Sequence, residues 1–237
     1  MIRTFRGTTN AWYLSLRAIE ILSIAKDTAS HELDHKALNL NIIQNLASAV
    51  EGSTRSLLIN HIENSNYYKD AIELVDLDLK AIIDHTLISL YKKPWGELNS
   101  LANQLFGSKI TEYYSGDFSS ILNLFHLRNI TAHGGVIIKK IDYIPRNPEL
   151  GVDSEEDRIE YDNRLELSNY LIQRKLISPE VINQIIDWEY FNNNVTSHFK
   201  EASFHFMKEF YSNYKLRFNC CNQIEKDYKI IKQHCDR

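Results

Sequence analysis

The chain has 237 residues, of which only 8 are Gly and 4 are Pro, and its formal net charge is -4. A chain of this length can bury a sizeable core, and so few helix-breaking residues favour long helices. The negative charge argues against nucleic-acid binding through bulk basicity, so any such contact has to be local.

The N-terminus has no apolar run of the kind a signal peptide carries, and no segment reaches the roughly 18 apolar residues of a membrane helix. The three cysteines are an odd number confined to the C-terminus: Cys220, Cys221 and Cys235. Without CxxC spacing, a cysteine-based metal site is not expected, and unpaired thiols indicate a reducing compartment. We therefore expect a cytoplasmic protein without a membrane segment, although the sequence assigns these cysteines no role.

Apolar residues at helical spacing predict a first helix over about 10–26, with Asn10 as its N-cap. Its expected core positions are Trp12, Leu16, Ile19 and Leu22. The apolar coverage is wide, which indicates that this helix is packed on more than one side. A polar connection follows, and a long helix is expected over about 36–64.

The clearest periodicity predicts a helix over about 69–91, which Pro94 ends. Its expected buried residues are Ile72, Val75, Leu79, Ile82 and Leu90. A short helix over about 97–106 stops at Gly107. The next helix, about 117–133, has Ser115 or Asp117 as its cap and ends before a Gly pair. Its expected buried stripe is Phe118, Ile121, Leu122 and Phe125.

The end of the 117–133 helix carries a cluster of polar residues, Arg128, Asn129 and His133. Asn129 and His133 are four residues apart and share a face, and the stem of Arg128 is long enough to reach the same region. A neutral imidazole can take the proton of a ribose 2′-hydroxyl, and a guanidinium can hold two phosphate oxygens. Asn129 can donate a hydrogen bond to the phosphate or orient the imidazole. No metal or other cofactor is needed for this chemistry.

The sequence Arg128-Asn129-x-x-x-His133 at a helix end resembles the R-N-x-x-x-H signature of the HEPN superfamily. The resemblance implies an all-α fold in which the signature lies on the last helix of a four-helix core. It also implies a metal-independent endoribonuclease whose two active-site copies meet across a homodimer, and cleavage that leaves a 2′,3′-cyclic phosphate. Many relatives act in toxin–antitoxin or antiviral defence, which makes a neutralising partner plausible.

Glu51 belongs to a stretch, residues 46–58, whose hydrophobic pattern resembles the first core helix of HEPN domains. Two interpretations are open for its carboxylate. It is either a second-layer partner of Arg128 or a solvent-facing residue.

Beyond the Gly pair, the residues Lys139, Lys140 and Arg146 make the region locally positive, which suits RNA phosphates. Residues 136–144 have high β-propensity and predict one strand or extended arm. The acidic stretch 149–166 is interpreted as a solvated loop, or as a flap that competes with RNA for the basic residues.

The remaining chain is predicted to be helical, and Ser178-Pro179-Glu180 has the form of a helix start. An aromatic stripe at helical spacing follows: Phe199, Ala202, Phe206 and Phe210. Such a stripe is most often core or dimer packing. With the basic residues Lys208, Lys215 and Arg217 beside it, stacking of RNA bases is the alternative.

Residues His31, Glu32 and His35 match the H-E-x-x-H spacing of zinc proteases, with Glu32 in the place of the general base. No third ligand completes a zincin pattern downstream. Exposed polar residues at a helix start are therefore the better interpretation, and we predict no metal site.

These patterns predict an all-α protein in three parts: an N-terminal helix and connection (1–35), a HEPN-like four-helix core with an extended arm (36–146), and an acidic loop with a C-terminal helical extension (147–237). The predicted function is cleavage of single-stranded or looped RNA, with RNA as substrate and a second copy as partner. The alternative is a catalytically inactive HEPN-like module that binds RNA, a nucleotide or a protein.

Overall fold

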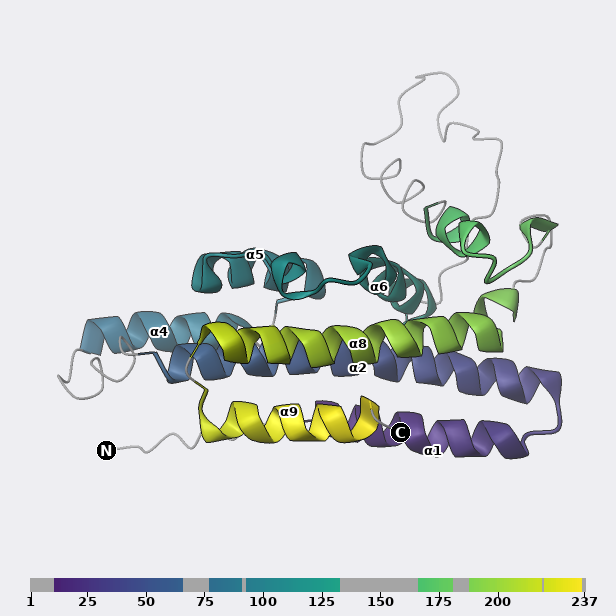
Figure 1. The fold of residues 1–237 in the computed structure, drawn as a ribbon, viewed down its shortest axis with the longest axis horizontal. Helices are drawn as coiled ribbons and strands as arrows, with labels where there is room; N and C mark the ends of the chain where they lie inside the picture. The colour runs from purple at the N-terminus through teal and green to yellow at the C-terminus, as the bar shows by residue number, and fades with distance from the viewer. Residues whose placement is uncertain are drawn as a thin grey trace, which may run out of the picture. The chain divides into compact units, whose positions relative to one another are not determined.

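The structure, a computed structural model, describes residues 11–65, 77–90, 93–132, 166–180, 188–218 and 220–235. All regular secondary structure in these ranges is helical, which confirms the all-α prediction (Figure 1). The predicted arm 136–144 lies outside the described residues, as does nearly all of the acidic stretch. Among the described helices, none combines the length and the apolar character needed to cross a membrane.

The described chain forms two compact units, each assembled from segments far apart in sequence. The first unit takes its described residues from Met1–Ala18, Ser48–Phe118 and Ala202–Arg237. The second takes them from Ile19–Ala47 and Ser119–Glu201. Helices α1, α2 and α8 contribute to both units.

Helix α1 runs over Trp12–Thr28, within two residues of the predicted bounds. Helix α2 runs over Glu32–Glu63 and so begins four residues before the predicted start. The acidic side chains of Glu32 and Asp34 lie in its first turn, where they complement the positive end of the helix dipole. The segment expected to be a polar connection is therefore largely the first turn of α2.

Helix α4 (Leu77–Leu90) and helix α5 (Trp95–Phe106) lie in the first unit. Gly107 ends α5 in the left-handed conformation with φ 67°, which confirms the predicted stop. A short 3₁₀ helix, η1 (Ile110–Tyr113), follows and was not predicted. Helix α6 (Phe118–Ala132) is the expected motif helix.

The C-terminal part contains η3 (Trp188–Phe191), α8 (Asn193–Arg217) and α9 (Asn222–Cys235). Figure 1 shows α8 running beside α2. In the first unit, the Tyr211 hydroxyl donates to the carbonyl oxygen of Ser53 at 2.8 Å. The predicted aromatic stripe lies on α8, and its three Phe residues are at most 1% exposed, so the packing interpretation is confirmed: Phe199, Phe206 and Phe210. Each buried Phe contributes on the order of 1.5–3 kcal/mol to stability.

Two of the predicted core positions are exposed rather than buried. Ile82 on α4 is 64% exposed, and the buried residues of that helix include Leu87 and Leu90. Leu122 on α6 is 42% exposed, whereas Leu124 is fully buried. In both helices the sequence offers more apolar positions than one buried face can hold, and the fold buries a stripe rotated from the predicted one.

The prediction that α1 is packed on more than one side is also wrong within the described chain. Trp12, Leu16 and Ile19 are buried as expected. The other face of the helix, however, carries three exposed large aliphatic residues, Leu14, Ile21 and Ile24.

Candidate functional site

The motif helix α6 is fixed in the second unit by a buried face. Its buried residues from Ser119 onward are Ser120, Ile121, Asn123, Leu124, Phe125, Leu127 and Ile130. Because Leu124 and Leu127 are fully buried, rotation of the helix about its axis would expose them and cost several kcal/mol in total. The polar side chains at the end of α6 therefore project from a rigid element.

Arg128 and Asn129 lie on the last turns of α6 and are bonded to each other. The Arg128 Nη1 donates to Asn129 Oδ1 at 2.8 Å, and the guanidinium carbon lies 5.9 Å from the centre of the Phe125 ring. Asn129 is exposed and Arg128 is partly exposed. Because its oxygen already accepts from Arg128, the Asn129 side chain presents its amide nitrogen as a donor.

The helix ends at Ala132, directly before His133. The Thr131 hydroxyl donates to the carbonyl oxygens of Leu127 and Arg128, at 3.1 and 2.9 Å. His133 itself lies outside the described residues, as do the predicted RNA-binding residues Lys139, Lys140 and Arg146. The structure thus describes two of the three motif residues and brings these two together.

Glu51 lies on α2 in the first unit, where it forms an ion pair with Arg55 at 2.6 Å. Its side chain is only 14% exposed. The same Arg55 donates to the carbonyl oxygens of Leu90 and Lys93, at 3.0 and 2.9 Å. Glu51 therefore helps to orient an arginine that ties α2 to the connection between α4 and α5, and its predicted role beside Arg128 stays a prediction.

A histidine within α6, His126, lies close to the motif in sequence, although the sequence pattern assigned it no role. Its Nδ1 atom is buried and has no hydrogen-bond partner in the described structure. Burial lowers the pKa of His126, and the nearby charge of Glu166 partly opposes this shift. The imidazole is therefore neutral at physiological pH.

The buried side of α6 also takes part in a chain of hydrogen bonds inside the second unit. The Tyr170 hydroxyl lies 2.7 Å from Ser120 Oγ and 2.7 Å from His198 Nε2. Arg174 covers the Tyr170 ring, with its guanidinium carbon 4.9 Å from the ring centre. This chain was missed because Ser120 sits in an apolar stripe, and its partners come from distant segments.

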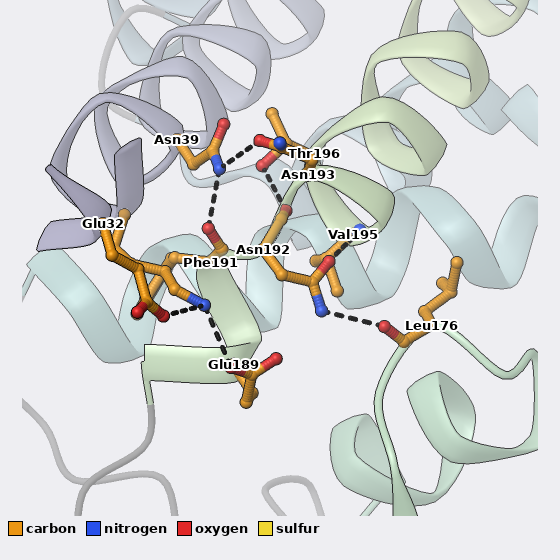
Figure 2. A network of polar contacts seen from close by, with 10 residues as sticks. Glu32, Asn39, Leu176, Glu189, Phe191, Asn192, Asn193, Val195 and Thr196 are labelled. Atoms are coloured by element: carbon orange, nitrogen blue, oxygen red, sulfur yellow. Dashed lines mark hydrogen bonds and ion pairs between the residues drawn. The ribbon is translucent and has the colours of Figure 1, made fainter. Parts of the chain in front are cut away.

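A polar network joins the starts of α2 and α8 in the second unit, as Figure 2 shows. The buried Lys36 amine pairs with Glu189 at 3.0 Å and with Glu32 at 3.6 Å. Asn39 donates to the Phe191 carbonyl oxygen at 2.7 Å and to Asn193 Oδ1 at 3.0 Å. Every charge in this network has a partner of opposite sign. We therefore interpret the network as structural, with the role of stabilising the contact between the starts of α2 and α8.

Within this network Asn192 caps α8. Its Oδ1 accepts from the Val195 backbone N–H at 2.9 Å, and its Nδ2 donates to the Leu176 carbonyl oxygen at 2.9 Å. The first contact satisfies a backbone donor that has no partner inside the helix.

The first unit contains a fully buried carboxylate, Asp227, on α9. Tyr13 and Gln223 donate to its Oδ1, while Ser56 and Tyr211 donate to its Oδ2. These bonds join α1, α2, α8 and α9. Burial and the bond to Asp227 raise the pKa of Tyr13, which keeps its hydroxyl protonated and able to donate. Asp227 is thus the polar centre of this unit.

The H-E-x-x-H residues lie at the start of α2 and take part in helix-end contacts. The His35 Nε2 lies 3.1 Å from the Ala29 carbonyl oxygen, and Glu32 pairs with Lys36. In the described ranges, no three His, Cys, Asp or Glu side chains are grouped in a way that suits a metal ion.

No protein-family model, curated protein or solved structure matches the chain. The relation to HEPN proteins therefore stays a prediction that depends on Arg128, Asn129 and His133.

Proposed function

We propose that the protein is a metal-independent endoribonuclease of the HEPN type that cuts single-stranded or looped RNA. The motif at the end of α6 is the proposed active site, with Arg128 as phosphate clamp, Asn129 as orienting donor and His133 as acid and base. A 2′,3′-cyclic phosphate is the proposed product.

The observation that carries this proposal is the hydrogen bond between Arg128 and Asn129 at the exposed end of a buried helix. The contact holds a guanidinium and an amide donor in one place, and Asn129 precedes the motif histidine by four residues in the sequence. Fixed donors of this kind suit a phosphodiester, because they need little rearrangement when negative charge builds on the phosphate oxygens.

The proposed reaction balances without a metal. His133 takes the proton of the ribose 2′-hydroxyl, the 2′-oxygen attacks phosphorus, and the bond from phosphorus to the 5′-oxygen breaks. The leaving 5′-oxygen takes up a proton, and the 2′-oxygen and 3′-oxygen stay on the same phosphorus as a cyclic diester. Arg128 offsets the charge on the non-bridging oxygens, an effect of about 10²–10³-fold in rate for a well-placed donor.

A homodimer in which two motifs form one composite site is part of the proposal, as is a role in toxin–antitoxin or antiviral defence with a neutralising protein partner. Both come from the resemblance of the motif.

The test is cleavage of a mixed-sequence RNA in EDTA by the wild type and by Arg128→Ala and His133→Ala. The matched control is Arg174→Ala, because Arg174 is also an arginine of the second unit beside an aromatic ring. We expect the wild type and the control to cut, and the two motif variants to lose at least a hundredfold in rate.

Cleavage that needs an added divalent metal would contradict the proposal, as would equal rates in all four proteins. RNA binding without cleavage by the folded wild type would favour the inactive binding module instead.

A further inference from the structure

The outward face of α9 is basic although the chain as a whole is acidic. The exposed residues of α9 are three lysines and two amides, namely Lys226, Lys229, Lys232, Asn222 and Gln233. We call the three lysines the α9 lysine face. They follow one another at three-residue steps, which places each Cα about 4.5 Å further along the helix axis than the one before.

The acidic residues within α9 do not neutralise this face. Glu225 pairs with Lys215 of α8 at 2.8 Å. Asp227 is fully buried and accepts four hydrogen bonds inside the first unit. The positive field of the α9 lysine face is therefore directed to solvent, within reach of a ligand.

The type of basic residue indicates the kind of ligand. Ammonium groups on flexible stems act as movable point charges, unlike the rigid bidentate fork of arginine. A row of such charges fits a flexible chain of phosphates whose spacing changes along its length. Tyr228, half-buried between these lysines, lies under Lys215, whose Nζ is 4.5 Å from the ring centre.

A membrane surface is the other polyanion that a basic helix can contact. Helices that bind at a membrane surface bury an apolar face in the headgroup region. In α9 that face already packs inside the protein, because Ile224 and Ile231 are at most 1% exposed. No large apolar residue of α9 is exposed beside the lysines, so a soluble polyanion fits this helix better.

We propose that the α9 lysine face binds the phosphate backbone of single-stranded RNA. The choice of RNA over another polyanion rests on the proposed function. The α9 lysine face supplies affinity for RNA that does not depend on base sequence, whereas the motif on α6 carries out the proposed cleavage.

The experiment measures binding of a fluorescent 2′-O-methyl oligouridylate by anisotropy at several salt concentrations. Without a 2′-hydroxyl this probe cannot be cut by the proposed reaction, so binding is separated from catalysis. The test protein carries Lys226→Gln, Lys229→Gln and Lys232→Gln. The control carries the same loss of charge at three other exposed lysines: Lys80→Gln, Lys109→Gln and Lys175→Gln.

Each phosphate contact to a single strand contributes about 0.7 to the slope of log affinity against log salt. We therefore expect the slope of the test protein to be smaller by about 2 than that of the wild type, with at least a tenfold loss of affinity at low salt. The control should match the wild type. Thermal unfolding should be the same for all three proteins, because the substituted side chains are exposed.

Three results would overturn the inference: equal affinity and slope in test protein and wild type, no binding of the probe by the wild type, or an equal loss in the control. Lysine-dependent binding to phosphatidylserine vesicles without RNA binding would assign the face to a membrane. If the wild type binds the probe through these lysines but does not cleave RNA, the result would count against the proposed function alone and would leave the binding inference standing.

Discussion

Replacing Asp227 by Leu is expected to destabilise the first unit by about 1–3 kcal/mol. Leu has a similar size but offers no acceptor to the surrounding donors. In the variant, the Tyr211 hydroxyl can still donate to the Ser53 carbonyl oxygen, and Gln223 can still donate to the Tyr13 hydroxyl at 3.2 Å. The buried donor that loses the carboxylate without such a replacement is the Ser56 hydroxyl. A stranded buried donor costs roughly 1–3 kcal/mol, which gives the stated range.

Urea unfolding followed by tryptophan fluorescence measures this loss, since Trp12 and Trp95 are buried in the same unit. Asp227→Asn is the matched control, because its side-chain carbonyl still accepts hydrogen bonds, and we expect it to lose less than half as much. A loss below 1 kcal/mol in the Leu variant would refute the reasoning, since it would mean that the donors find other acceptors or water.

Three further predictions concern pH, packing and capping. Burial lowers the pKa of His61 and of His126. The unfolded chain, with ordinary histidine pKa values of about 6.5, therefore binds more protons below that pH, so stability should be constant above about pH 6.5 and fall as the pH drops below it. Urea midpoints across pH 5 to 8 check this, and a midpoint that rises on acidification over the same range would contradict it. Gly52→Ala should cost about 1–3 kcal/mol, because a Cβ there would lie 2.6 Å from the Cβ of Trp12, and thermal unfolding unchanged from the wild type would disprove this close approach. Asn192→Ala should cost about 1 kcal/mol by removing the cap of α8, whereas Asn192→Asp should keep the cap; equal unfolding midpoints for the two variants would exclude a capping role.

The helices could be predicted because their signals are local. Apolar spacing and a Gly at the C-terminal end located α5 and its stop at Gly107. The start of α2 was placed too late because the acidic residues around Asp34 were taken as a connection, although they favour a first helical turn.

The choice of buried face was less predictable, because it depends on partners far away in sequence. The apolar residue Ile82 lies on a helix with several apolar faces, and periodicity alone did not show which one is covered. The same limit hid the cluster around Asp227, whose partner Tyr13 is 214 residues away along the chain. The proximity of Arg128 to Asn129, in contrast, could be predicted because the two are neighbours in sequence, although the hydrogen bond between them was not.

The most direct test of the proposed activity uses a DNA oligonucleotide that contains one ribonucleotide, incubated with the wild type in EDTA and analysed by mass spectrometry. We predict a single cut on the 3′ side of that ribonucleotide and a 2′,3′-cyclic phosphate end, both absent with Arg128→Ala. Cleavage at deoxynucleotides, or an end that never passes through the cyclic phosphate, would contradict it, because the proposed chemistry requires the 2′-hydroxyl as the attacking group.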